Sequence, residues 1–419
     1  MIRACGRAVS TLLSAAVVWG GFFALTALAE EAPVETATQS QTVTTEPKSS
    51  FSLFSRFPVV FSLSVDGGYD TNPGTSSGSS RGSVFDSARG NLSYEAGTQR
   101  WHLTLTAVTE VVYFFDNAPS TNPEVNTSFQ LTGHYNVSDR LTLSLGLTGS
   151  YQAEPDFSAN IGPNRRAGYF FTTTDTLSAS YQWTPLISTV SSEMFMLVNY
   201  DDAMVGAFAD RIENTLDQQV LFHLSLRTAL VAEYRFQVVD YKTFPHDSTS
   251  NYVLGGIDHS FNSRVNVSLR GGVNFRSYTG GSTKTAPQFD GTLNYAIGRK
   301  SSLSWITHYG LEAPDSPTVA NTTAFRTGVQ LQYGLTPRII STVGAYYIHN
   351  DNQSFSTPGI AGMDTSDDTY DVSLNVQYSL NRHWAFHVGF DASGTNSNLN
   401  SPTADYSRQR YSAGLNFTF

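Results

Sequence analysis

From Val59 to its last residue, the chain repeats one pattern that limits its folds: segments of about ten residues in which apolar and polar side chains alternate. Such alternation predicts β-strands with one apolar and one polar face. Short connections, such as 97–100 and 137–140, alternate with long ones, such as 116–126 and 152–169. Eight short and nine long connections would join about eighteen strands. An even number of antiparallel strands, with the short turns at one end, is typical of closed barrels that span a membrane.

The composition agrees with strands rather than helices in the membrane. Only 14% of the residues are charged and 13% are aromatic. Even so, after residue 29 no stretch approaches the roughly 18 consecutive apolar residues of a membrane helix. We therefore predict an all-β fold, a transmembrane antiparallel β-barrel of about 18 strands with short periplasmic turns and long extracellular loops. A soluble β-sandwich or propeller would also alternate, but it would not separate the loop lengths in this way.

The amino-terminal segment predicts export. Arg3 and Arg7 precede an apolar run over 12–28, and Ala27 and Ala29 form the small-x-small pattern of a cleavage site. We expect a signal peptide over 1–29, a disordered periplasmic leader over 30–56, whose composition is polar, and the barrel over 57–419. The only cysteine is Cys5. The mature chain therefore has none and must be stable without disulfides.

The charge of the chain limits its partners. Without Arg3 and Arg7, the 25 basic residues fall to 23 against 35 acidic ones, which gives the mature chain a formal charge of −12. An acidic protein is a poor partner for nucleic acid, whose phosphates attract Lys and Arg. We expect outer-membrane lipid as a partner, and no nucleic acid.

The last strand keeps an apolar face up to the final residue. Its outward members include Tyr411, Leu415, Phe417 and Phe419, at a spacing of two or four residues. This ending resembles the terminal insertion signal of bacterial outer-membrane β-barrels, in which a final Phe is the most characteristic residue. The resemblance implies a location in the bacterial outer membrane and the barrel-assembly machinery as a partner.

Aromatic residues predict the orientation of the barrel. The four Trp residues after the signal peptide all lie within a few residues of a short turn. Trp prefers the membrane interface, so they predict an inner aromatic girdle. The girdle comprises Trp101, Trp183, Trp305 and Trp384. Aromatic residues at the far ends of strands predict an outer girdle of Tyr69, Tyr113, Phe115, Tyr200, Phe275, Tyr309 and Tyr347.

A short motif follows the first strand. It reads Gly-Gly-Tyr-Asp-Thr-Asn-Pro over 67–73, and one short turn reads Leu-Thr-Pro-Arg over 335–338. These motifs resemble a family of porin-like outer-membrane β-barrel proteins whose members often accompany exopolysaccharide biosynthesis genes. The resemblance covers about 59–419. It implies a barrel and, through the gene association, polysaccharide or its fragments as a candidate partner.

The polar faces of the strands predict the lumen. If the apolar faces meet lipid, the intervening residues point inward. Charges of both signs there predict a hydrated lumen, since a barrel of sixteen to eighteen strands leaves an aqueous channel. The excess of carboxylates predicts a mild preference for cations. The principal predicted lumen-lining residues are Glu110, Glu193, Glu213, Asp217, Glu233, Arg235, Arg270, Arg276, Arg326 and Asp371, with Arg89, Asp290 and His308 among the others.

Motifs of enzymes are few. The sequence His-Asp-Ser at 246–248 weakly resembles the His-x-Ser arrangement of outer-membrane phospholipases, without the glycine-containing context of that family. The acidic pairs at 201–202 and 367–368 are adjacent in sequence. Adjacent residues of a strand point to opposite faces, which argues against a paired-carboxylate site. We predict no catalytic, cofactor-binding or metal-binding residues.

Two functions stay open at this point. The first is a porin-like channel for the passive passage of small hydrophilic solutes or polysaccharide-related material. The second is a non-conducting scaffold barrel whose long loops bind a partner or matrix. A lumen constricted by an inward loop would still be compatible with the channel, whereas a lumen filled by side chains or by the leader would favour the scaffold barrel.

Overall fold

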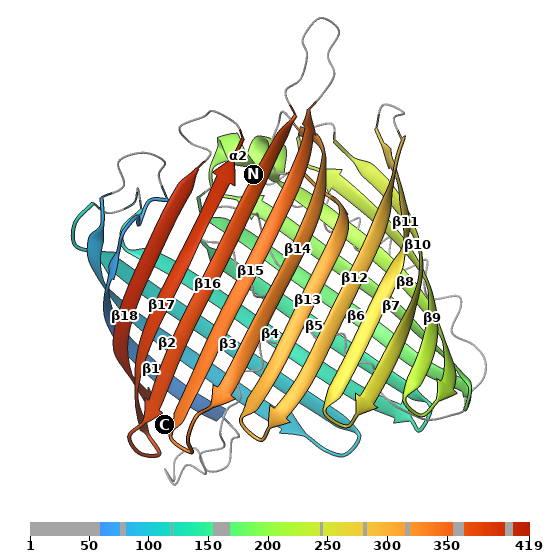
Figure 1. The fold of residues 1–419 in the computed structure, drawn as a ribbon, viewed down its shortest axis with the longest axis horizontal. Coiled ribbons are helices and arrows are strands. Elements are labelled where there is room, and N and C mark those ends of the chain that lie inside the picture. The colour runs from blue at the N-terminus through green and yellow to red at the C-terminus, as the bar shows by residue number, and fades with distance from the viewer. Residues whose placement is uncertain are drawn as a thin grey trace, which may run out of the picture.

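The computed structural model describes residues 59–75, 81–117, 119, 121–153, 168–243, 246–279, 283–314, 319–354, 364–398 and 405–419. Within these ranges, eighteen strands form one closed antiparallel barrel (Figure 1). The predicted fold is confirmed. The predicted signal peptide and leader, over 1–29 and 30–56, lie outside the described residues and stay predictions.

All eighteen strands are longer than the roughly 9 to 11 residues that cross a bilayer, so their ends reach beyond it. They are β1 (Val59–Asp70), β2 (Ser83–Gly97), β3 (Trp101–Phe114), β4 (Glu124–Ser138), β5 (Leu141–Gln152), β6 (Phe170–Thr184), β7 (Ile187–Tyr200), β8 (Arg211–Ser225), β9 (Thr228–Tyr241), β10 (Ser248–Asn262), β11 (Val265–Tyr278), β12 (Thr283–Gly298), β13 (Ser301–Glu312), β14 (Val319–Gly334), β15 (Ile339–Ser354), β16 (Thr365–Ser379), β17 (Trp384–Ser397) and β18 (Tyr406–Thr418).

Consecutive strands pair with one another, and the ring closes between the first strand and the last. The closing ladder runs from Ser62 opposite Thr418 to Asp70 opposite Arg410. Closure pairs the backbone of two strands that would otherwise present unsatisfied N–H and C=O groups to lipid.

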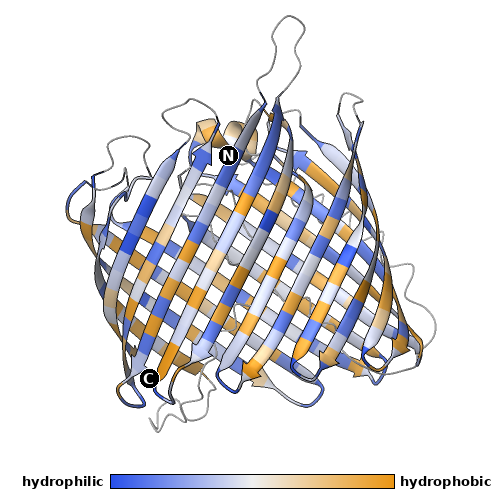
Figure 2. Ribbon diagram, in the orientation of Figure 1, coloured by the Kyte–Doolittle hydropathy of each residue, from blue (hydrophilic) through white to orange (hydrophobic). Residues whose placement is uncertain are grey.

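Apolar and polar residues alternate along the strands (Figure 2). At the carboxyl end, the residues of the predicted insertion signal lie on the outer face, where Leu415 and Phe419 are exposed. The ring of Phe417 packs between those of Trp384 and Phe419, with centroids 4.6 and 4.5 Å away. The last strand therefore joins the aromatic belt at the end of the barrel that carries the short turns.

The other Trp residues lie on the same outer face. Two of them use their indole N–H groups within the wall, since Trp183 donates to Thr189 Oγ1 (3.0 Å) and Trp305 donates to Thr327 Oγ1 (2.9 Å). A polar tip beside an apolar ring suits the membrane interface.

One member of the predicted outer girdle is wrong. Tyr200 is only 4% exposed and packs inside the barrel against Phe170 and Val198. Its place at the end of β7 suggested an interface residue. The register of the strand turns it inward instead.

The segment between β7 and β8 contains a helix that the sequence did not predict, α2 (Ala203–Ala209). Asp202 caps it, accepting a hydrogen bond from the backbone N–H of Met204 (2.8 Å). Ala209 packs with Phe170 and Val198 on the inner wall. Among the described residues, no helix is both long and apolar enough to cross a membrane.

The connection between β11 and β12 is shorter than predicted. We expected a long loop over 277–287, but strand β12 already begins at Thr283 and runs through Pro287. These outer residues of β12 pair with β11. Their pairing with β13, however, starts only at Phe289 opposite Tyr309.

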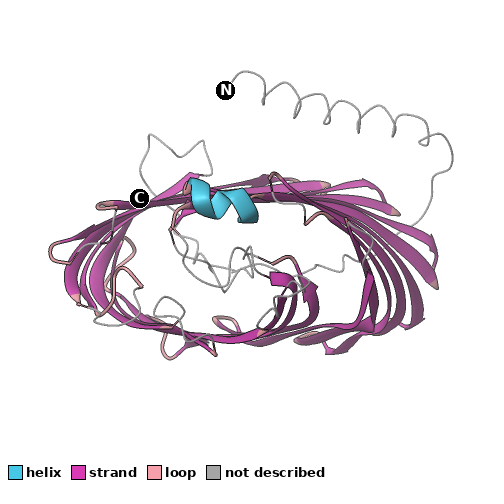
Figure 3. Cartoon of the chain, turned by 90° about the horizontal axis from the view of Figure 1, so that it is seen from above, coloured by secondary structure: helices cyan, strands magenta, loops and turns pink. Residues whose placement is uncertain are grey.

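The wall therefore overlaps itself at its outer end. β13 continues to pair with β14 as far as Glu312. By contrast, β12 and β13 do not pair between Phe289 and the outer end of the barrel. Leu311 continues the outward series of β13, yet it is only 3% exposed because the neighbouring wall covers it. Seen from above, part of the wall bends into the interior (Figure 3). We call residues 310–314, 319–324 and 349–354 the inner flap, and residues 274–278 and 283–288 the outer flap.

Candidate functional site

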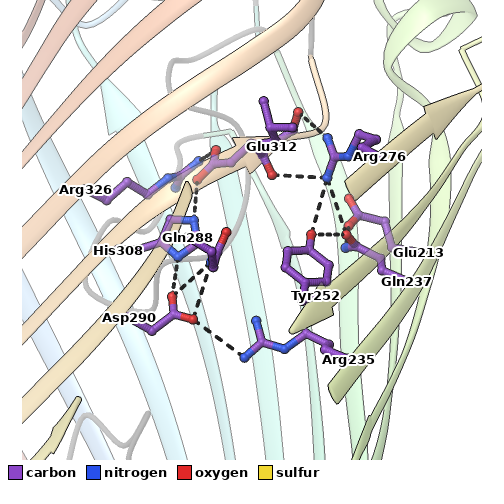
Figure 4. A network of polar contacts seen from close by, with 11 residues as sticks. Glu213, Arg235, Gln237, Tyr252, Arg276, Gln288, Asp290, His308, Glu312 and Arg326 are labelled. Carbon is purple, nitrogen blue, oxygen red and sulfur yellow. Dashed lines mark hydrogen bonds and ion pairs between the residues drawn. The ribbon is translucent and has the colours of Figure 1, made fainter. Parts of the chain in front are cut away.

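Ionisable side chains gather on the inner wall from β8 to β14 (Figure 4). Period-two alternation puts them on one face, and the antiparallel register sets partners opposite each other. Asp217 lies opposite Arg235, and Arg270 lies opposite Asp290. The network consists of the carboxylates Glu213, Asp217, Glu233, Asp258, Asp290 and Glu312 and the guanidinium groups of Arg211, Arg235, Arg270, Arg276 and Arg326.

Arg270 joins two carboxylates. Its two terminal nitrogens bind Asp258 Oδ1 and Oδ2 at 2.8 and 3.0 Å, and its Nε lies 3.4 Å from Glu233 Oε2. Glu233 also accepts from Arg235 Nη2 at 2.6 Å. The two-pronged geometry fixes both planes and gives strong, charge-assisted hydrogen bonds. These charges are therefore held against the wall.

His308 connects the next part of the network. Its Nδ1 lies 2.6 Å from Asp290 Oδ1, and its Nε2 lies 3.8 Å from Glu312 Oε1. Asp290 is also 3.6 Å from Arg235, while Glu312 binds Arg326. One histidine thus links carboxylates of β12 and β13.

The outer part of the network begins at β8. Arg211 Nε donates to Glu213 Oε1 (2.8 Å), and Gln237 donates to the other oxygen of that carboxylate (2.9 Å). The hydroxyl of Tyr252 donates to Gln237 Oε1 (2.8 Å). The guanidinium carbon of Arg235 lies 5.4 Å from the centre of the Tyr252 ring, within the range of a cation–π contact.

Arg276 is the most deeply buried cation of the network, with 1% of the residue exposed. Its Nη1 donates to the carbonyl of Glu312 (2.9 Å), its Nη2 to the carbonyl of Leu311 (3.1 Å) and its Nε to Ser250 Oγ (2.8 Å). Backbone carbonyls of the inner flap thus hold this charge. Arg276 is the point where the network and the overlap of the wall meet.

The structure brings seven of the ten principal predicted residues into this network: Glu213, Asp217, Glu233, Arg235, Arg270, Arg276 and Arg326. Two others lie on the inner wall away from it. Glu110 on β3 forms an ion pair with Arg89 (3.0 Å), and Asp371 on β16 lies opposite Ser393.

The prediction for Glu193 is wrong, because this residue lies on the outer face. It is paired in register with Leu177 and Leu216, which are 54% and 42% exposed. The inward series of β7 includes Val198 instead. The face of this strand was ambiguous in the sequence, since apolar residues such as Phe195 stand in one series and Val198 in the other.

The sequence reasoning missed Arg211, Asp258 and Glu312. Asp258 carried a usable signal, because it falls between the outward positions 257 and 259 of β10. Arg211 and Glu312 stand at strand ends that were read as parts of loops. Their place in the network depends on where the strands end.

The Tyr-Asp-x-Asn motif lies at the end of β1 and contacts β18, where the barrel closes. The carboxylate of Asp70, fully buried, accepts from Arg408 Nε (2.8 Å) and Arg410 Nε (3.1 Å) on β18. Asn72 donates to the carbonyl of Ser407 (3.1 Å). Deeper in the barrel, Asp66 contacts His387 of β17. The Tyr-Asp-x-Asn stretch therefore ties β1 to its partner at the seam where the sheet closes.

Neither the His-Asp-Ser sequence at 246–248 nor the acidic pair at 367–368 has the arrangement of an active site. His246 is only 5% exposed, with its ring 5.8 Å from that of Tyr241, and burial lowers the pKa of His246. The adjacent carboxylates Asp367 and Asp368 bind different groups, since the first accepts from Asn352 and the second from Tyr347. In the part of the chain that the structure describes, no group of three or more His, Cys, Asp or Glu side chains could hold a metal ion.

Comparison with known families agrees with this barrel. The profile of the family described as "Putative beta-barrel porin 2" matches residues 55–419, which include every described strand. The chain belongs to this family. It is therefore a porin-like β-barrel of the bacterial outer membrane.

Several solved structures are similar to this member of the porin family. They include OccAB4 of Acinetobacter baumannii (10% identity, TM-score 0.42, 86% of this chain and 98% of that chain) and OccK1 (OpdK) of Pseudomonas aeruginosa (12% identity, TM-score 0.42, 86% and 99%). The siderophore receptor PirA of Pseudomonas aeruginosa is also similar (8% identity, TM-score 0.37, 87% and 80%). None of the curated proteins compared with the chain matches it.

Proposed function

We propose that the barrel is a passive channel for small hydrophilic solutes across the outer membrane. The observation that carries this proposal is the inner wall from β8 to β14, where six carboxylates stand with five guanidinium groups. Ionised groups are costly to enclose without water or partners. A wall with this composition therefore suits a hydrated passage.

The pairing of these charges limits selectivity. Arg270 and Arg235 are bound to carboxylates within the wall, so little net field is left for a passing ion. We expect a weak cation preference from the small carboxylate excess. Polysaccharide-related material stays a candidate cargo through the family resemblance, because hydroxyl groups can exchange hydrogen bonds with such a polar surface.

A second candidate is the non-conducting scaffold barrel. It is favoured by the inner flap, which bends into the interior at the outer end of the barrel and carries buried residues such as Leu311 and Ala324. If the flap blocked the passage permanently, the long loops would be the functional surface. We favour the channel because the charged network extends along the wall below the flap.

The proposal includes partners and excludes catalysis. Outer-membrane lipid surrounds the apolar face, and the barrel-assembly machinery inserts the chain through its last strand, while nucleic acid has no role. We propose no hydrolytic activity, since Asp367 and Asp368 bind groups on opposite faces of their strand.

The test is single-channel conductance of the folded barrel in a planar bilayer, with a salt gradient to measure selectivity. We expect stable steps with a weak cation preference. Glu110→Gln leaves the partly exposed Arg89 without its carboxylate and should shift selectivity toward anions. Glu193→Gln makes the same chemical change on the outer face and is the matched control. Added oligosaccharides would then test block by sugars.

Silence from protein that is folded and inserted would overturn the channel and favour the scaffold. Equal shifts in selectivity for Glu110→Gln and Glu193→Gln would show that the inner wall does not line the conducting path.

A further inference from the structure

The overlap of the wall offers two ways to arrange the same strands. We infer that the inner flap is a gate, closed when it lies across the inside of β11 and β12, and open when the outer end of β13 pairs with β12. This inference rests on the proposed channel function. It assigns the control of passage to the wall itself.

The open arrangement follows from the existing register. Below the seam, Phe289 lies opposite Tyr309. Continuing that ladder would set Pro287 opposite Leu311 and Thr285 opposite Ala313. Pro287 has no N–H to donate, which weakens a continuous ladder at this point and explains why the seam can stay unzipped. β12 and β13 could therefore continue to pair beyond Phe289, but this additional pairing is not strongly favoured.

The closed arrangement is held by a small number of hydrogen bonds between the flaps and the wall behind them. Arg276 donates to the carbonyls of Leu311 and Glu312, as described above. Tyr241 of β9 donates to the carbonyl of Pro314 (2.9 Å). Lys284 of β12 donates to Gln353 of β15 (2.8 Å). Pairing of β13 with β12 would break these contacts, so they act as latches.

Packing between the flaps is imperfect. Asn274 is fully buried, and neither atom of its amide has a hydrogen-bond partner among the residues that the structure describes. Within the same residues, Gln288 Oε1 is also buried and lacks a partner. A buried polar atom without a partner raises the free energy of the state that contains it. The closed arrangement therefore lacks the full satisfaction of a permanently packed core and is suited to reversible opening.

Gly310 marks the point where the strands separate. A Cβ at this position would lie 2.0 Å from Gln288 Oε1. The missing side chain lets β13 turn inward past β12. Gly310 in β13 and Pro287 in β12 thus both favour the separation of the two strands at this point.

The first experiment detects the open arrangement by cross-linking. In the open register, Thr285→Cys and Ala313→Cys would lie opposite each other. The described residues contain no cysteine, so the introduced pair reports alone. Tyr295→Cys with Leu303→Cys, which are opposite in the structure, is the control for strands that always pair.

We expect the control pair to oxidise fully and the Thr285/Ala313 pair to oxidise more slowly, with a measurable shift in gel mobility. Arg276→Met removes the main latch and should increase the oxidation rate of the test pair several-fold. Absence of cross-linking in the test pair, with and without Arg276→Met, while the control pair oxidises, would overturn the gate.

The second experiment measures the effect on conductance. The open arrangement should conduct more than the closed one. Oxidised Thr285→Cys/Ala313→Cys should therefore stay at the larger conductance until a reductant is added, and Arg276→Met should increase the fraction of time that the channel spends at the larger conductance. Arg89→Met removes another inner-wall arginine outside the flaps and should leave gating unchanged. If Arg276→Met fails to fold, Tyr241→Phe removes only one latch bond and should act in the same direction.

The two readouts separate the claims. Cross-linking with no conductance in either redox state would establish flap movement and overturn the channel function. Conductance that is the same in the oxidised and reduced double variant would overturn the gate and leave the channel function supported.

Discussion

Glu193 provides the sharpest test of the face assignment, because it sets a carboxylate against lipid. It is the seventh of the fourteen residues of β7 and lies between the exposed side chains of Leu177 and Leu216. Asp175, diagonal to it on β6, also lies on the outer face, opposite Leu147. We therefore predict that Glu193→Leu stabilises the barrel in a bilayer.

The magnitude follows from depth. A Lys or Arg at the midplane of a barrel wall costs roughly 2 to 4 kcal/mol, and Asp or Glu costs less. A mid-strand position lies near that midplane. Removing the carboxylate and adding a leucine should therefore raise the free energy of unfolding by about 1 to 2 kcal/mol. Glu193→Gln should give a part of this gain, because it removes the charge and leaves a polar group.

The assay is reversible urea unfolding in lipid vesicles, followed by tryptophan fluorescence. Glu110→Leu is the matched control, since it makes the same change on the inner wall and takes the carboxylate from Arg89. It should give no stabilisation. A neutral or destabilising effect of Glu193→Leu, with the slope against urea unchanged, would refute the outward assignment or show that another protein covers this residue.

Three further predictions concern other parts of the barrel. Arg270→Met leaves the partly buried carboxylate of Asp258 without its arginine and takes one of two arginines from the buried Glu233, so it should lower the free energy of unfolding by about 3 kcal/mol, measured in the same vesicles. Arg89→Met, at a more exposed pair, should cost less than about 1 kcal/mol. Burial lowers the pKa of His246, against the opposing effect of Asp247. The folded segment thus favours the neutral imidazole. The free energy of unfolding of this segment should be highest above about pH 6.5 and should decrease as the pH falls below that value. The protection factors for hydrogen exchange around His246, which correct for the intrinsic pH dependence of exchange, should therefore fall from pH 7.5 to pH 5 in the wild type but not in His246→Gln. Deletion of Phe419 removes a ring that packs on Phe417 and should slow assembly into vesicles, followed by gel mobility, whereas Ser412→Ala on the inner face should not.

The strands could be predicted because most of them separate apolar from polar residues without ambiguity. In β18, Leu415 and Phe417 alternate with Gly414 and Asn416, and only one assignment of faces suits lipid. Where both series contain apolar residues, as around Glu193 in β7, the pattern does not choose a face. The choice then depends on the register with β6 and β8.

The overlap at β12 and β13 could not be predicted from alternation. Pro287 was read as the end of a loop, since proline is rare within paired strands. It lies within β12, at the part of the strand that pairs with β11 and not with β13. Period-two patterns report which residues share a face. They do not report which edge of a strand lacks a partner.

The charged network could be predicted only in part, because alternation within a strand does not give the register between strands. Each inward charge could be assigned from its own strand, as for Arg235 and Arg270. Their pairing depends on the relative register of β8 to β12, which fixes Asp217 opposite Arg235 and Arg270 opposite Asp290. The sequence therefore predicts a charged lumen. The finding that these charges form ion pairs with one another within the wall requires the structure.

Glu312 shows why charge and shape of the passage are connected in this barrel. Its carboxylate binds Arg326 and lies near His308, so it belongs to the charged lining. Its backbone carbonyl accepts from Arg276, so it also belongs to the latch of the inner flap. Movement of the flap would displace one carboxylate from the network and release one buried guanidinium. Opening would therefore alter the local charge along with the width, because the residues that close the wall are the residues that neutralise it.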